Sequence, residues 1–239
     1  GSGSALTKSG SGTLKLSGIN TYEGTTTIEA GVLEVSNSRA LGASTRGSNS
    51  NGTAIQQGGA LHLAGGASAE DFLLAEQLTL GSYSSSGEAI LKLVSGSATI
   101  TNPFELHGDS AIETLAATEL LLNDTTASSG AAMITLGSSC GLSSSCSLRI
   151  GGYGSSSSSS GSVKTFLDPS SSAGSDGIDL GSEKLIVNNN GVFKISGVST
   201  VKGSVLVDSG DLQLAHVDAL QPSDITMQNG ATYSFLTDF

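Results

Sequence analysis

Short runs in which apolar and polar residues alternate fill most of the chain, and glycine closes many of them. In GTLKLSGINTYEGTTTIEAG (residues 12–31), Leu14 and Leu16 are flanked by polar residues. A period of two is typical of β-strands with one buried face. Similar runs recur along the chain, among them ALHLAGG, ILKLVSG, FELHG and SLRIGG. The pattern predicts an all-β chain, and for residues 67–78, which also fit a short helix, we favour a bent strand.

The opening pattern returns near the end of the sequence. Residues 191–220 align without a gap to residues 12–41, and ten of the thirty positions are identical. Glycine has no Cβ and so permits tight corners and close backbone approach. We therefore predict eight structural glycines at equivalent corners of the two copies: Gly12 and Gly191, Gly18 and Gly197, Gly24 and Gly203, Gly31 and Gly210.

Many short strands can build a sandwich, a barrel or a coil of strands. Aromatic residues make up only 4 % of the chain and tryptophan is absent, whereas two sheets packed about 10 Å apart need bulky inward side chains. Coils stacked about 4.8 Å apart need only small aliphatic ones.

We therefore predict a right-handed parallel β-helix. At about 20–25 residues per coil it has roughly ten coils, in one unit over residues 1–239 with 1–4 as a linker. The Ser/Gly-rich segments 43–52, 151–162 and 166–182 are predicted to be loops that leave the coil.

Charge and cysteine content restrict the function. The net charge is −11 with ten lysines and arginines, which argues against nucleic acid and anionic membrane surfaces as partners. No apolar run of about 18 residues is present, so we expect no membrane insertion of this segment as a helix. Cys140 and Cys146 are close enough in sequence to form a local disulfide, and their spacing suits a disulfide better than a zinc site.

The segment SGSGTLKLSGINTYEGTTTIEAGVLEVSNSRALG (residues 9–42) resembles the autotransporter-associated β-strand repeat, also called the passenger-associated transport repeat. That repeat has the form L-x-L-S-G-x-N-T-Y-x-G-x-T-x-I followed by G-x-L. TITNPFELHGDSAIET (99–114) is similar to segments that lie between such repeats. The resemblance implies a right-handed β-helix in a long exported protein, so we expect a secreted or cell-surface location.

Four candidate chemistries are weak. GSSCG (137–141) fits G-x-S-x-G with Ser139 as nucleophile, but no helix follows, as a hydrolase elbow requires. We expect His62, His107 and His216 to be outward-facing or capping residues. Asp168, Asp176, Asp179 and Glu183 do not have EF-hand spacing and are expected to be solvated loop acids. TTTIE (25–29) suggests a threonine ladder, but the second copy has SVLVD there.

We predict a structural, extension or adhesion role and no enzymatic activity, with no catalytic residue, cofactor or metal. Cell-surface or matrix components are the expected partners, and unpaired end strands permit end-to-end self-association. Two alternatives stay open: a polysaccharide lyase or hydrolase on the same fold, and a self-assembling filament or shell component.

Overall fold

The computed structural model is all-β over the residues that it describes, and these contain no helix. Among the described residues of the range 67–78 it has strand β7 (Leu73–Leu74) and Leu78, the first residue of β8 (Leu78–Leu80). The described residues are 3–42, 52–68, 71–81, 87–115, 118–123, 132–140, 146–151, 162–165, 177–197, 199–216, 219–220 and 224–235.

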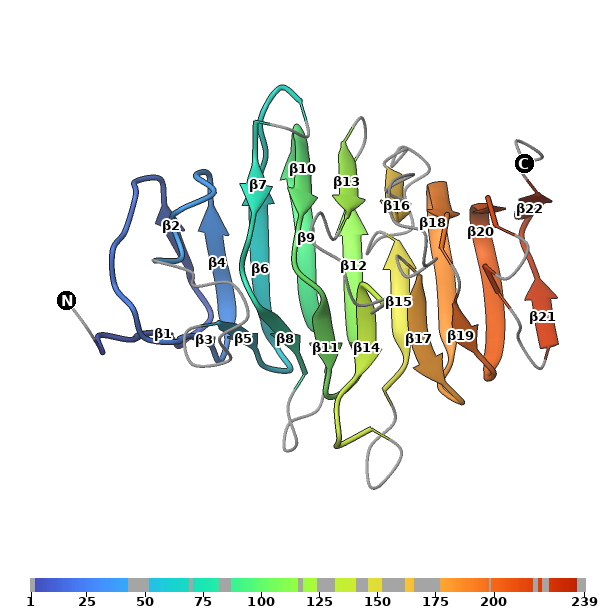
Figure 1. Cartoon of the computed structure of the whole chain (residues 1–239), viewed down its shortest axis with the longest axis horizontal. Helices are drawn as coiled ribbons and strands as arrows, with labels where there is room; N and C mark the ends of the chain where they lie inside the picture. The colour runs from blue at the N-terminus through green and yellow to red at the C-terminus, as the bar shows by residue number, and fades with distance from the viewer. Residues whose placement is uncertain are drawn as a thin grey trace.

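Two sheets are made by these strands, all of them paired in parallel (Figure 1). Sheet A consists, in spatial order, of β1 (Leu6–Lys8), β3 (Thr26–Ile28), β5 (Thr53–Ile55), β8 (Leu78–Leu80), β11 (Phe104–Leu106), β14 (Ile134–Leu136), β17 (Ile178–Gly181) and β19 (Thr200–Val201).

Sheet B bends into two arms that share the long strands β18 (Leu185–Ile195) and β20 (Ser204–Leu214). Arm B1 consists of β2 (Thr13–Leu16), β4 (Gly31–Val35), β6 (Gly59–Ala64), β9 (Ala89–Ser95), β12 (Ser110–Thr114), β15 (Leu148–Gly151), the first halves of β18 and β20, and β21 (Asp224–Met227). Arm B2 consists of β7, β10 (Ser97–Ile100), β13 (Glu119–Leu122), β16 (Ser162–Thr165), the second halves of β18 and β20, and β22 (Thr232–Phe235).

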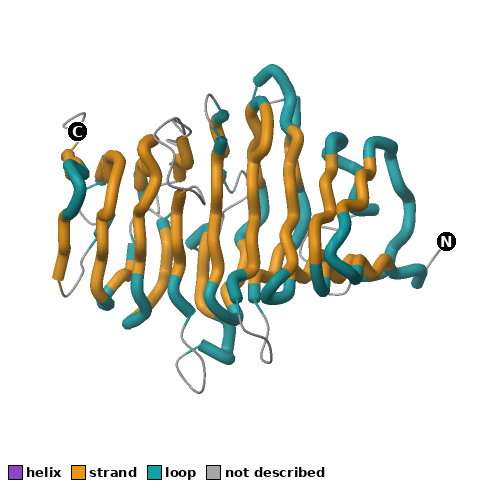
Figure 2. Tube along the Cα trace, turned by 180° about the vertical axis from the view of Figure 1, so that it is seen from behind, coloured by secondary structure: helices purple, strands orange, loops and turns teal. Residues whose placement is uncertain are grey.

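From β5 to β20 the chain visits sheet A, arm B1 and arm B2 in turn, and each circuit stacks on the one before it. The first two circuits have strands in sheet A and arm B1 only, and the last in arms B1 and B2 only. Within the described residues this gives nine coils, so the fold is a parallel β-solenoid, as the sequence predicts. The tube view from behind shows the same row of stacked strands from one end of the molecule to the other (Figure 2). The right-handed winding stays a prediction of the crossover rule.

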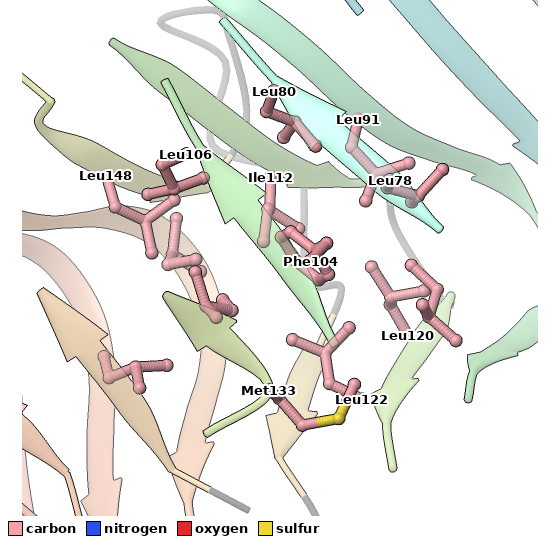
Figure 3. Close-up of a cluster of buried hydrophobic side chains, with 14 of the residues drawn as sticks. Leu78, Leu80, Leu91, Phe104, Leu106, Ile112, Leu120, Leu122, Met133 and Leu148 are labelled. Carbon is pink, nitrogen blue, oxygen red and sulfur yellow. The ribbon is translucent and has the colours of Figure 1, made fainter. Parts of the chain in front are cut away.

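Inward side chains form columns of aliphatic residues through the interior. One column of arm B1 pairs in register through seven coils and is fully buried: Leu33, Leu61, Leu91, Ile112, Ile150, Val187 and Val207. Figure 3 shows how Leu78 of sheet A, Ile112 of arm B1 and Leu120 of arm B2 point into one shared interior. Because like stacks on like at the strand spacing, aliphatic side chains fill this core with few aromatics.

The two sequence copies occupy different faces of the solenoid. Residues 13–16 of the first copy form β2 in arm B1, whereas the aligned residues 192–195 lie in arm B2. Ile28 belongs to sheet A, and its aligned residue Val207 to arm B1. The copies therefore share their order of strands and corners, but each strand of the second copy lies one face further around the solenoid than its aligned strand in the first copy.

The predicted loop at 166–182 is partly wrong. Ile178–Gly181 is strand β17 and pairs with β14 and β19 inside sheet A, because Ile178 and Leu180 point into the core. Likewise Gly151 and Ser162 are strand residues at the ends of the predicted loop 151–162. Residues 43–51, 152–161 and 166–176 lie outside the described residues.

Two pairs of aligned glycines share a structural role. Gly31 and Gly210 have φ values of +69° and +87°, a region that disfavours residues with a Cβ. A Cβ on Gly24 would lie 2.5 Å from the carbonyl oxygen of Ser4, and one on Gly203 would meet that of Glu183. A Cβ on Gly12 would meet nothing within 4 Å.

We predict that Gly31→Ala lowers the free energy of unfolding by about 2 kcal/mol or more, because it combines a positive φ with a backbone clash. A Cβ there would lie 2.6 Å from the carbonyl oxygen of Gly12. The matched control, Gly12→Ala, is expected to change it by less than about 0.5 kcal/mol. Urea denaturation followed by circular dichroism measures both, and equal effects would contradict the proposed role of Gly31.

Candidate functional site

The motif residues near the N-terminal end tie successive coils together. Asn20 donates from Nδ2 to the carbonyl oxygen of Ala40, at 2.7 Å, and from its backbone N–H to that of Arg39. The Tyr22 hydroxyl lies 2.6 Å from Thr26 Oγ1 inside the coil. Gly42 has a φ of +96° and packs against the Tyr22 ring, where a Cβ would lie 3.0 Å from two ring carbons. The Asn-Thr-Tyr segment thus fixes the corner of one coil to the next.

Residues 6–35, which include Asn20 and Tyr22 of this corner, match the family model of the passenger-associated transport repeat. The chain contains a passenger-associated transport repeat. The matched residues span β1 to β4 and cover the first two coils. No curated protein and no solved structure gives a significant match to the chain. The match suggests an autotransporter passenger-type protein and points to no ligand.

A charge network crosses the outer surface of arm B1. Arg149 of β15 donates from Nη2 to Glu88 at 2.6 Å and to Glu113 at 3.0 Å, and from Nε to both oxygens of Glu88. Lys92 of β9 lies 3.0 Å from Glu113. These four residues come from three successive coils and carry two positive and two negative charges. The network is therefore neutral as a group and connects coils through side chains.

Burial makes this network energetically sensitive. The Glu113 side chain is 2 % exposed and that of Arg149 9 %. Arg149 pairs in register with Ala111, whose small side chain is fully buried, and so can reach past β12 toward Glu88. Burial alone lowers the pKa of Arg149, but hydrogen bonds and charge from Glu88 and Glu113 outweigh it and raise the pKa. Arg149 is therefore a cation at every physiological pH.

His62 and Glu34 continue the same column toward the N-terminal end. Register pairing places Glu34, His62, Lys92 and Glu113 in sequence across β4, β6, β9 and β12. Burial, followed by the charge of Lys92, lowers the pKa of His62 below its usual value. His62 is therefore neutral at pH 7. At the exposed end, Lys15 pairs with Glu34 at 2.8 Å.

Ser139 and His107 lie next to each other in the structure, although they are 32 residues apart in the sequence and no motif links them. His107 Nδ1 lies 3.0 Å from Ser139 Oγ, and its Nε2 lies 3.0 Å from Glu105 Oε2. This is the order of groups in a hydrolytic relay. Ser139, however, is only 3 % exposed and also donates to the carbonyl oxygen of His107 at 3.3 Å. The exposed end of the relay is Glu105, so the hydroxyl is not presented to a substrate.

Gly137 leaves the space that the His107 ring of this cluster occupies. A Cβ on Gly137 would collide with the His107 ring, so the glycine of GSSCG is needed for packing. Cys140 and Cys146 form a disulfide with their Cα atoms 5.5 Å apart. Cys146 N–H donates to Glu183 Oε2 at 3.1 Å. The cluster and the disulfide together attach the turn after β14 to the neighbouring coils.

The remaining candidate residues do not converge on a site. Asp179 is exposed and accepts a hydrogen bond from Gly181, while Glu183 holds Cys146. Asp168 and Asp176 lie outside the described residues. Within the part of the chain that the structure describes, no three His, Cys, Asp or Glu residues are placed to hold a metal, and no helix is long and apolar enough to cross a membrane. His216 lies after β20, half-buried.

Threonine is more regular on sheet A than the aligned copies suggest. The outward column in register is Thr7, Thr27, Ala54, Thr79, Glu105, Thr135, Asp179 and Thr200. The segment SVLVD does not test this ladder, because it lies in arm B1 and the threonine column lies on sheet A. The column is still interrupted by Ala54 and by the charged Glu105 and Asp179.

A shallow hollow of about 140 Å³ lies beside this column. Its lining consists of Thr25, Gly52, Thr53, Ala54, Gln77, Thr79 and Glu105. No aromatic or basic side chain is among these residues. A sugar would therefore find hydroxyl groups and one carboxylate here, but no stacking platform and no partner for an acidic group.

We predict that Arg149→Met lowers the free energy of unfolding by about 3 kcal/mol, because it leaves the buried Glu113 carboxylate with Lys92 alone. The control, Lys15→Met, removes a cation that is 71 % exposed and is expected to cost less than about 0.5 kcal/mol. Urea denaturation at pH 7 compares the two. A loss from Arg149→Met no greater than that from Lys15→Met would show that the network does not contribute to stability.

Proposed function

We propose that the chain is a rigid spacer in the exported part of a passenger-type protein, acting outside the cell by extension and not by catalysis. The observation that carries this proposal is the continuous aliphatic interior of the solenoid, whose first two coils match the passenger-associated transport repeat. Nine coils at about 4.8 Å each correspond to a rod of about 40 Å. Such a stack gains length one coil at a time, since each coil contacts only its neighbours.

The outer surface supports a structural role better than an enzymatic one. Polysaccharide lyases of this architecture act on acidic sugars, which require cationic residues in the binding groove. The sheet A hollow offers Glu105 in their place, and the buried Arg149 and the partly buried Lys92 are already paired with Glu88 and Glu113. The buried polar groups described above serve contacts between coils.

A spacer should tolerate removal of a whole coil. Removing residues 33–60 joins Val32 directly to Leu61, and because Leu33 and Leu61 pair in register, the joined strand keeps its inward and outward faces. We expect a folded protein that is shorter by about 4.8 Å, with an unchanged β signal in circular dichroism. Small-angle X-ray scattering measures the length.

Removal of residues 33–61 is the matched control. It joins Val32 to His62, so that His62 faces the interior and Leu63 faces solvent. We expect this variant to be unfolded or aggregated. If both deletions behave alike, the coils are not independent units of length.

Catalysis is tested by incubating the purified chain with polygalacturonate and alginate. We expect no rise in reducing ends and no ultraviolet absorbance from unsaturated product. Turnover that is lost in a Glu105→Gln variant would instead support the polysaccharide-degrading alternative.

The extracellular location is tested with antibodies to the chain, which should label intact cells of the source organism without permeabilisation.

A further inference from the structure

Glu76 is buried in the interior of the solenoid and has no cationic partner among the described residues. It lies at the end of the third coil, after β7 and two residues before β8, and is 2 % exposed. Thr53, which begins the same coil in β5, donates from Oγ1 to Glu76 Oε1 at 3.1 Å. This hydrogen bond joins the two ends of one circuit of the chain. The charge state of Glu76 therefore acts on the closure of that coil.

Among the described residues, the group bonded to this carboxyl is the Thr53 hydroxyl, and no cation pairs with it. Thr53 pairs in register with Thr26, which is fully buried and contacts the Tyr22 hydroxyl. The neighbouring strands β3, β5, β7, β8 and β10 contain no ionisable residue. Glu105 of β11 is exposed on the outer surface. Tyr22, whose own pKa is raised mainly by burial, is the titratable group on the inner side.

An uncharged residue, Asn102, occupies the position in the next coil that corresponds to Glu76. Asn102 precedes β11 by two residues, as Glu76 precedes β8, and it is 3 % exposed. Its Nδ2 donates to the carbonyl oxygen of Ala75 at 3.1 Å, whereas its buried Oδ1 has no hydrogen-bond donor. Asn102 therefore brings an uncharged amide, with an oxygen that lacks a donor, against Ala75, the residue before Glu76.

We propose that Glu76 is a proton-operated latch that closes the third coil when it is protonated and loosens the second to fourth coils when it ionises. Burial raises the pKa of Glu76 from 4.5 to about 7, partly opposed by the hydrogen bond from Thr53. The unfolded chain releases this proton near pH 4.5 and the folded chain only near pH 7. Stability from this group is therefore fully present below pH 4.5 and is lost as the pH rises through 7.

Amide hydrogen exchange, corrected for its intrinsic pH dependence, tests the latch in the full chain. The equilibrium constant for opening β5 and β8 is expected to rise by up to about tenfold per pH unit between pH 5 and 7 and then to level off. Amides of β18 and β20, far along the rod, should not follow this profile. A flat profile at β5 and β8 would overturn the proposal.

Three variants separate the latch from a general loss of stability. Glu76→Gln should give a level pH profile and at least tenfold less opening at pH 8 than the unmodified chain. Thr53→Val removes the hydrogen bond that holds the pKa down, so the profile should move to higher pH. Glu113→Gln changes a carboxyl group that is equally buried but ion-paired, and it should leave the profile at β5 and β8 unchanged. Persistence of the profile in Glu76→Gln would assign it to another group.

Discussion

In-register stacking of inward aliphatic side chains is the constraint on which the rest of this structure depends. A single coil is too thin to bury its own leucines, and each becomes buried only when the coils above and below are present. Full burial of one such side chain contributes about 1.5–3 kcal/mol, and Leu61 and Leu91 each have a leucine or isoleucine on both sides in the column. Stability therefore grows with the number of coils, while the register must be kept throughout.

The same stacking places like positions of neighbouring coils next to one another, so a polar group is stable only with a complement one coil away. Glu113 meets this condition with Lys92 and Arg149. Glu76 does not meet it among the described residues: the group bonded to it is the Thr53 hydroxyl of its own coil, and it holds its proton to about pH 7. The two glutamates are equally buried, and their difference follows from what the adjacent coil supplies.

Local patterns were sufficient to predict the strands and the solenoid, because alternation and glycine corners are properties of single segments. The face on which a strand lies was not predictable, since strands of all three faces alternate alike and the aligned copies are rotated by one face. Arg149 and Glu88 are separated by 61 residues along the chain, and nothing in their own segments pairs them. Glu76 carries a weak local signal, because it lies two residues before the inward Leu78 and shares its phase.

The contrast between the surface and the interior bears on function. Among the described residues, the groups with unusual chemistry are turned inward or toward a neighbouring coil: Ser139 is buried behind His107, and Glu76 lies in the interior. The exposed column of sheet A consists mainly of threonine, with scattered acids and the sheet A hollow. An enzyme needs reactive groups that a substrate can reach, whereas a spacer needs only contacts that keep its coils in register. The distribution of polar groups in this chain fits the second requirement.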